Sequence, residues 1–217
     1  MQWPLLGVLS DSDRREVLQR ARRRRFARQE IVFHEGDPGD ALHLVEKGHV
    51  AIRIHTPLGD VATVRIVRPG EFFGELAVIA PGPRNATAVA LDPTDTLVVD
   101  RAQLTELREQ HAHVDSMLIE ALASEVRRLA QQLVDAMYVP VDKRVWRRLR
   151  EMTIVFGTDD APELEIPITQ DVLAQLAGCT RPTANRTLRA GEEAGIIRMA
   201  RGRLEILDLP AVEKRAR

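Results

Sequence analysis

The sequence predicts an α+β fold with three parts in chain order: a jelly-roll-like β-domain over residues 1–114, a long helix over 115–139 and a winged helix-turn-helix domain over 140–217. Three observations support this prediction. Glycines recur every 11 or 12 residues from Gly36 to Gly82, an apolar pattern in steps of three and four follows, and two short helical segments joined by a glycine-containing turn come last.

The composition is that of a globular protein, since 44% of the 217 residues are hydrophobic and 29% are charged. Cys179 is the only cysteine, which excludes a disulfide framework and a cysteine-bound zinc or iron–sulfur site within one chain. No apolar run reaches the ~18–20 residues of a membrane span, and the stretch Trp3–Leu9 is too short for a secretory signal. We therefore expect a cytoplasmic protein with no metal and no membrane partner.

Short segments with strand character lie between the regularly spaced glycines. They cover residues 41–45, 50–55, 61–67, 86–91 and 96–100. Gly, Pro and Asp residues flank them at 36–39 and at 57–60. Short strands at this spacing, separated by such turns, are typical of an antiparallel sandwich or barrel.

A heptad-like apolar seam begins after Asp115. Its six positions are Ile119, Leu122, Val126, Leu129, Leu133 and Ala136. Charged and amide side chains occupy the positions between them, so the seam is narrow, and Pro140 ends the helix. A narrow seam at this spacing predicts a parallel coiled-coil homodimer. The alternative is that the seam packs on the β-domain of its own chain.

The C-terminal part carries the start and stop signals of two short helices. Thr169 is a suitable N-cap for a helix over Gln170–Ala177, which Gly178 ends. Thr180 then caps a second helix over Arg181–Gly191. Two helices joined by a short glycine-containing turn predict a helix-turn-helix motif.

Further elements are expected on both sides of this motif. A helix over Asp142–Met152 precedes it, and a β-hairpin wing over residues 195–207 turns at Arg201 and Gly202. The window 169–203 holds six arginines against three acidic residues, although the whole chain has a net charge of −1. This local excess points to a polyanionic partner at this end of the chain, or to an ordinary solvated face.

The most specific local pattern combines a glycine, the start of a short helix and an arginine ten residues after the glycine. Gly74 precedes the segment Glu75–Ile79, and Arg84 follows it. Free N–H groups at a helix start and a guanidinium both suit an anion such as phosphate, and Glu75 can accept hydrogen bonds from a sugar hydroxyl. The alternative is a glycine turn beside a surface arginine.

The residues Phe-Gly-Glu-Leu-Ala at 73–77 and Arg-Asn-Ala at 84–86 resemble the phosphate-binding cassette of cyclic-nucleotide-binding domains. The order of β-roll, long helix and winged helix-turn-helix, with motifs at 35–37, 126–129 and 178–181, resembles the bacterial cyclic-AMP receptor protein/FNR family of transcription regulators. The resemblance implies a homodimeric DNA-binding regulator, gated by a small anionic effector such as cyclic AMP or another cyclic nucleotide. It also implies RNA polymerase as a partner.

The resemblance further implies the ligand contacts. In the cassette they are Gly74, Glu75, Leu76, Arg84 and Asn85, the first two holding the ribose and the last two the cyclic phosphate. Gln132 and Leu133 stand where cyclic-AMP-responsive members have adjacent Thr and Ser; Gln132 can hydrogen-bond a base edge, whereas Leu133 cannot. The alternative is a family member that binds DNA without cyclic nucleotide, its pocket vestigial or taking another ligand.

The DNA contacts are expected on the second helix and around it. The candidates are Thr169, Gln170, Thr180, Arg181, Thr183, Arg186, Arg189 and Arg201. Arg181 and Arg186 are the expected base readers, because the arginine fork matches guanine O6 and N7. Thr169, Gln170 and Arg201 are expected to contact phosphates, which fixes the register without reading sequence.

Several features set this sequence apart from particular relatives or other classes. Pro182 stands where the cyclic-AMP receptor protein has a Glu and cannot accept from a cytosine amine, so discrimination at that base pair should be weaker or come from shape. The oxygen-sensing branch needs an N-terminal cysteine cluster, which this chain lacks.

His43 and His49 lack the close pairing of a metal-dependent jelly-roll enzyme, so we expect no enzymatic activity. We interpret Arg22–Arg25 as a solvated face.

Overall fold

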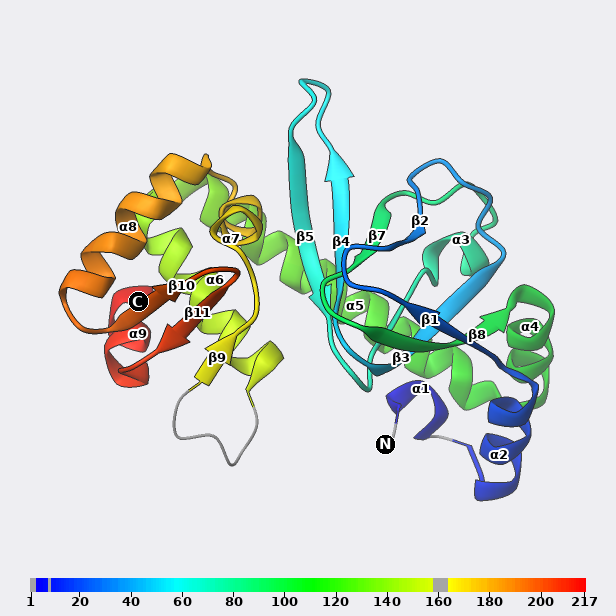
Figure 1. Ribbon diagram of the computed structural model, residues 1–217. Helices are drawn as coiled ribbons and strands as arrows, with labels where there is room; N and C mark the ends of the chain where they lie inside the picture. Colours follow the sequence, from blue (N-terminus) through cyan, green and yellow to red (C-terminus); the bar gives the residue numbers. More distant parts are fainter. Residues whose placement is uncertain (1–2, 8, 158–163) are drawn as a thin grey trace. The chain divides into compact units, whose positions relative to one another are not determined.

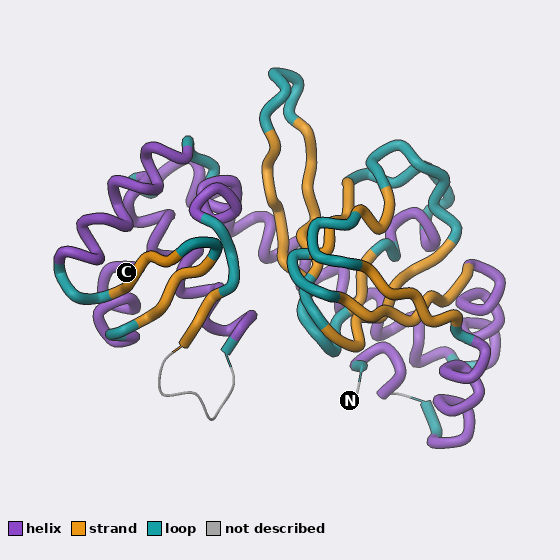
Figure 2. Tube along the Cα trace, viewed as in Figure 1, coloured by secondary structure: helices purple, strands orange, loops and turns teal. Residues whose placement is uncertain are grey.

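The computed structural model describes residues 3–7, 9–157 and 164–217 (Figures 1 and 2). The chain forms two compact units: Met1–His55 with Arg65–Leu129, and Thr56–Val64 with Ala130–Arg217. The boundary between the two units falls inside the long helix, which the sequence predicts to be a separate segment over 115–139. The domain limits 1–114, 115–139 and 140–217 remain a prediction. No described helix is both long enough and apolar enough to cross a membrane.

Two four-stranded sheets form the β-sandwich of the N-terminal half, with the strand orders β1-β8-β3-β6 and β2-β7-β4-β5. The strands are β1 (Arg22–Phe26), β2 (Ile31–Phe33), β3 (Ala41–Lys47), β4 (Val50–His55), β5 (Val61–Val67), β6 (Phe72–Phe73), β7 (Thr87–Ala90) and β8 (Thr94–Asp100). The five predicted strands are confirmed to within two residues at each end.

The sequence analysis does not predict β1, β2 or β6. Strand β1 contains the four arginines 22–25, all of them exposed, and only Phe26 at its end is buried. A run of arginines lacks the apolar–polar alternation of a half-buried strand, so the pattern gives no strand signal. The backbone pairs with β8 at the edge of the sheet all the same. The predicted solvated face is confirmed, but it lies on a strand.

Alternation along β3 separates two hydrophobic cores. Leu42 and Leu44 belong to the larger core, which Trp3 also enters, while Val45 belongs to a smaller core with residues of both sheets. The helices that contribute to the larger core are α1 (Pro4–Gly7), α2 (Asp11–Arg20), α3 (Leu76–Ile79), α4 (Arg101–Gln110) and α5 (Ala112–Tyr138). Trp3 is anchored further by its indole N–H, which donates to the carbonyl of Val45 at 3.0 Å.

His43 faces the side of β3 opposite to Leu42 and Leu44. Its ring stacks on Phe73 with centroids 5.0 Å apart, and its Nδ1 lies 3.2 Å from Oγ1 of Thr96. Burial, and secondarily the positive charge of Arg84, lower the pKa of His43 to about 3. The imidazole is therefore neutral in the folded protein at neutral and mildly acidic pH.

This neutral histidine predicts a loss of stability in acid. Below about pH 6.5 the unfolded chain binds a proton at His43, whereas the folded chain binds this proton only near pH 3. The free energy of unfolding should therefore fall by up to about 1.4 kcal/mol per pH unit in this window. Urea unfolding of the wild type and of His43→Phe at pH 7.5, 5.5 and 4.5 checks this. Equal slopes against pH in both proteins would contradict it.

The second unit contains the helix-turn-helix and its wing. Besides the start of β5 and the end of α5, its elements are α6 (Val141–Phe156), β9 (Leu164–Ile166), α7 (Gln170–Ala177), α8 (Arg181–Glu193), β10 (Ile197–Ala200), β11 (Arg203–Ile206) and α9 (Leu209–Ala216). The predicted bounds of α7 are confirmed, and α6 and α8 run four and two residues further than expected. The wing is confirmed as β10 and β11, and β9 adds an unpredicted third strand beside β11. The Gly-, Asp- and Pro-rich stretch 157–162 is typical of a loop, and apart from Gly157 it lies outside the described residues.

The helix caps agree with the prediction at α7 and differ at α8. The hydroxyl of Thr169 accepts from the backbone N–H of Val172, and Gly178 ends α7 with φ +59°. Thr180 makes no such cap; its hydroxyl lies 3.0 Å from that of Thr183. Pro182 occupies the second helical position and has no N–H group, so the N–H of Thr183 is the one that a capping hydroxyl of Thr180 could still bind.

Candidate functional site

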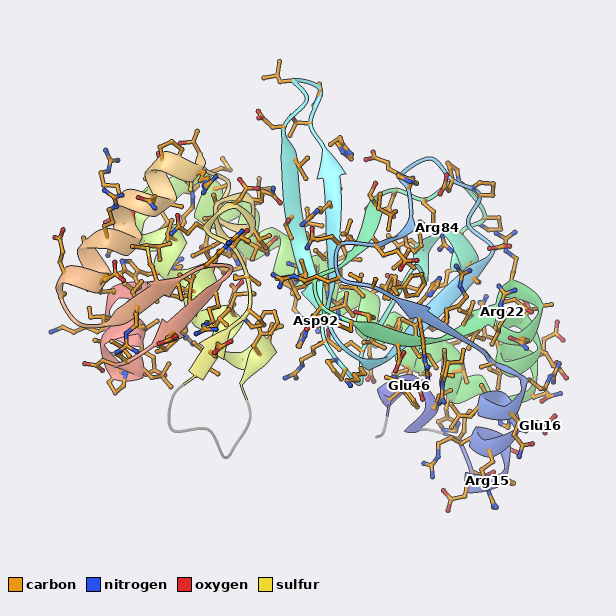
Figure 3. All side chains as sticks on the ribbon, viewed as in Figure 1. Arg15, Glu16, Arg22, Glu46, Arg84 and Asp92 are labelled. Carbon is orange, nitrogen blue, oxygen red and sulfur yellow. The ribbon has the colours of Figure 1, made fainter. Side chains whose placement is uncertain are left out.

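The predicted glycine and arginine lie together beside α3 (Leu76–Ile79), where Arg84 is labelled in Figure 3. Nη1 of Arg84 donates to the carbonyl of Gly74 at 2.8 Å, and Nη2 donates to the carbonyl of Ala41 at 2.7 Å. Gly74 has φ +83°, and a β-carbon at this position would lie 2.8 Å from Nη1 of Arg84. Both the backbone conformation and the close approach of the guanidinium therefore require glycine here.

Arg84 is buried, with a relative exposure of 5%, so the alternative of a surface arginine is wrong. Its guanidinium carbon lies 4.1 Å from the ring centroid of Phe33. Its Nε is buried and has no hydrogen-bond partner among the described residues. A buried N–H group without an acceptor is unfavourable, and an anionic oxygen is the acceptor that a guanidinium binds most strongly.

The other cassette residues surround Arg84 at different depths. Glu75 is half-buried, and this burial raises the pKa of its carboxyl group, while the charge of Arg65 opposes the shift. Leu76 and Asn85 are exposed. The cassette thus combines a buried cation, a half-buried carboxyl group and an exposed amide, which suit a phosphate and a neighbouring sugar.

Gln132 and Leu133 belong to the second unit, and Arg84 belongs to the first. Nε2 of Gln132 donates to the carbonyl of Val64 at 3.5 Å, and the side chain of Leu133 is exposed. The role of Gln132 as a base contact stays a prediction.

The apolar seam of α5 is uncovered on a single chain. Ile119, Val126 and Leu133 are each more than 60% exposed, and Leu129 is also exposed. Leu122 is half-buried, and Ala136 is exposed. A different face of the helix, including Val114 and Leu118, packs into the core of the chain's own β-domain. The alternative in which the seam itself covers this domain is therefore wrong for these exposed positions.

The predicted DNA contacts gather along one side of α8. Arg181, Arg186 and Arg189 are exposed and line an open groove that Gln170 of α7 also lines. Arg201 is exposed in the turn of the wing, whereas Thr183 is half-buried. Thr169 caps α7, so its hydroxyl is already engaged with the backbone N–H of Val172.

Sequence reasoning missed two groups in these sites. The carbonyl of Ala41 and the ring of Phe33 hold Arg84, and both come from strands far away in the chain. Asn185 lines the groove of α8, and its Nδ2 donates to Oε1 of Gln170 at 2.6 Å. A signal for Asn185 existed, because it follows Arg181 by four residues and lies on the same helix face.

Comparison with known proteins identifies both domains. Residues 23–111 match the cyclic nucleotide-binding domain family, and residues 143–215 match the Crp-like helix-turn-helix domain. The CRP-like cAMP-activated global transcriptional regulator of Mycobacterium tuberculosis is 32% identical over 194 residues, which cover 88% of this chain and 87% of that protein. The chain belongs to the CRP/FNR family. The cyclic AMP receptor protein of Thermus thermophilus is 30% identical over 212 residues, which cover 97% of this CRP/FNR chain and 95% of that protein.

Solved structures confirm the predicted α+β architecture. FixK2 from Bradyrhizobium japonicum has a TM-score of 0.78 at 20% identity, covering 89% of this chain and 96% of that one. The catabolite activator protein of Thermus thermophilus has a TM-score of 0.57 at 30% identity, covering 98% of each chain. The CRP/FNR chain is thus a transcription regulator with a cyclic nucleotide-binding domain and a DNA-binding helix-turn-helix domain, and the relatives named here are regulators rather than enzymes.

Proposed function

We propose that this CRP/FNR regulator is a homodimer that binds an inverted-repeat operator when a cyclic nucleotide, cyclic AMP in the first place, occupies its β-domain. The observation that carries this proposal is the buried Nε of Arg84, which lacks an acceptor beside a glycine turn. The cyclic phosphate would accept from this guanidinium, with Asn85 beside it, and Gly74 and Glu75 would hold the ribose. The effector can gate DNA binding only by binding one conformation of the dimer more tightly than another.

A second candidate is a regulator that binds DNA without a cyclic nucleotide. Both Nη atoms of Arg84 already donate to backbone carbonyls, and Leu133 cannot hydrogen-bond a base. Calorimetric titration with cyclic AMP and cyclic GMP, with operator binding measured in parallel, separates the two. Binding of cyclic AMP that strengthens operator binding supports gating. If the protein bound neither nucleotide but still bound the operator, the result would support the second candidate.

We propose that α8 enters the major groove. Arg181, Arg186 and Arg189 are exposed on the same side of the helix, which is the geometry that base reading needs. A two-fold dimer then requires half-sites about one helical turn, ~34 Å, apart. Because the partner is DNA and the relatives control transcription, we also propose the cytoplasm as the location and RNA polymerase as a further partner.

The docking of α8 predicts different effects for two exposed arginines. Arg186→Ala should weaken binding to the selected operator by about 1–3 kcal/mol and relax the preference at one base pair in each half-site. Arg201→Ala, in the wing, should weaken all sequences similarly and reduce the salt dependence of binding. Titration of operator variants at several salt concentrations measures both effects. An Arg186→Ala protein as selective as the wild type would rule out this docking.

A further inference from the structure

A pair of amide side chains joins the two helices of the helix-turn-helix. Nδ2 of Asn185 on α8 donates to Oε1 of Gln170, the first residue of α7, at 2.6 Å. Nε2 of Gln170 lies 3.3 Å from the sulfur of Met199 on β10. Gln170 is thereby held from two sides, and it fixes the position of the Asn185 amide at the groove that both residues line.

The bond to Gln170 leaves the recognition edge of Asn185 free for another partner. An Asn side chain carries two N–H donors and one carbonyl acceptor. One N–H is used by Gln170, which leaves one N–H and Oδ1 of the same amide for a partner in the groove. This pair is complementary to N7 and the N6 amine of adenine, which asparagine contacts with two hydrogen bonds in the major groove.

The chemistry of the groove makes this acceptor important. Besides Asn185 and its partner Gln170, the described side chains that line the groove over residues 181–189 are Arg181, Arg186 and Arg189, which only donate, and Pro182, which has no polar side-chain atom. Glu193 also lines the groove, but it follows Asn185 by eight residues, about 12 Å along the helix axis. A face of arginines alone favours guanine and has no means of accepting a hydrogen bond from a base amine.

We propose that Asn185 is a specificity-determining residue that reads an adenine in each operator half-site, and that Gln170 positions it for this contact. The inference rests on the proposed docking of α8 in the major groove and adds the base that this surface recognises beyond guanine. Asn185 supplies an acceptor on a face where Pro182 supplies none.

The test is selection of bound sequences from random duplexes by the full-length protein, with and without cyclic AMP. Wild type, Asn185→Ala, Gln170→Ala and Arg186→Ala are compared. Asn185→Ala should lose the preference for adenine at one position per half-site, a discrimination of about 5- to 150-fold. Gln170→Ala should weaken the same preference to a smaller extent. Both variants should keep the preference at the base pair that Arg186→Ala relaxes.

The outcomes separate this inference from the proposed function. A wild type that selects no inverted repeat would overturn the docking of α8, and this inference with it. A wild type that selects an inverted repeat, together with an Asn185→Ala protein of unchanged base preferences, would overturn this inference alone. A uniform loss of affinity in Asn185→Ala, with every base preference retained, would assign the pair a purely structural role and would also overturn it.

Discussion

Replacing both Val126 and Leu129 with lysine is expected to convert the dimer into monomers. Both side chains are exposed on a single chain, 65% and 42% respectively, and both belong to the heptad seam of α5. In a parallel dimer the double variant would bring four like charges into one apolar interface, where they have neither water nor partners. Operator binding should fall with dimerisation, because two recognition helices must engage the half-sites together.

Sedimentation equilibrium of the double variant, with circular dichroism to verify the helix content, measures the effect. Glu120→Lys combined with Ser124→Lys is the matched control, because both residues are exposed on α5 outside the seam. The control should remain dimeric. If the Val126 and Leu129 variant also sedimented as a dimer, the seam would not be the interface between the subunits.

Arg84→Leu should reduce the affinity for an effective cyclic nucleotide at least tenfold. The substitution removes the charge and the donors that would bind the cyclic phosphate, an interaction worth about 1.5–3 kcal/mol for a hydrogen bond to a charged group. Arg84→Lys keeps the charge but loses the planar fork, so its affinity for the nucleotide should lie between that of the wild type and that of Arg84→Leu.

Calorimetric titration of the three proteins measures these affinities. The control is Arg28→Leu, which removes an exposed arginine of the same domain and should bind as the wild type does. Arg84 also bonds to the carbonyls of Gly74 and Ala41, so the folded fraction of each variant is measured by urea unfolding. Equal affinity of a folded Arg84→Leu protein and the wild type would exclude Arg84 from the binding site.

Elements with local signals were the ones that could be predicted from the sequence. The bounds of α7 follow from Thr169 and Gly178, because a capping hydroxyl and a residue with positive φ act within one turn of the helix end. The heptad seam could also be predicted, because the periodicity that defines it lies within one helix. Helix α9 had a comparable signal that was overlooked: Asp208 caps it through the N–H of Ala211, and a proline occupies its first turn.

Features that depend on distant parts of the chain could not be predicted in the same way. The spacing of Gly74 and Arg84 predicts an arginine that faces a ligand, but no spacing rule gives the bond of Arg84 to the carbonyl of Ala41, 43 residues away. Strand β1 forms because its backbone pairs with β8, where Arg25 also lies opposite Asp95 in an ion pair, and a run of arginines gives no local signal for either contact. The contact between Gln170 and Asn185 depends on the angle at which α7 meets α8, which sequence spacing does not define.

The two hydrogen bonds from Arg84 to the backbone also affect which substitutions such a regulator can tolerate during evolution. A substitution at Arg84 would remove the proposed effector contact and, at the same time, the hydrogen bonds that its guanidinium donates to the carbonyls of Gly74 and Ala41. A lineage that no longer uses the effector would therefore still be under selection for folding to retain this arginine. An arginine at this position of a CRP/FNR chain therefore has a structural role in addition to the proposed contact with the effector.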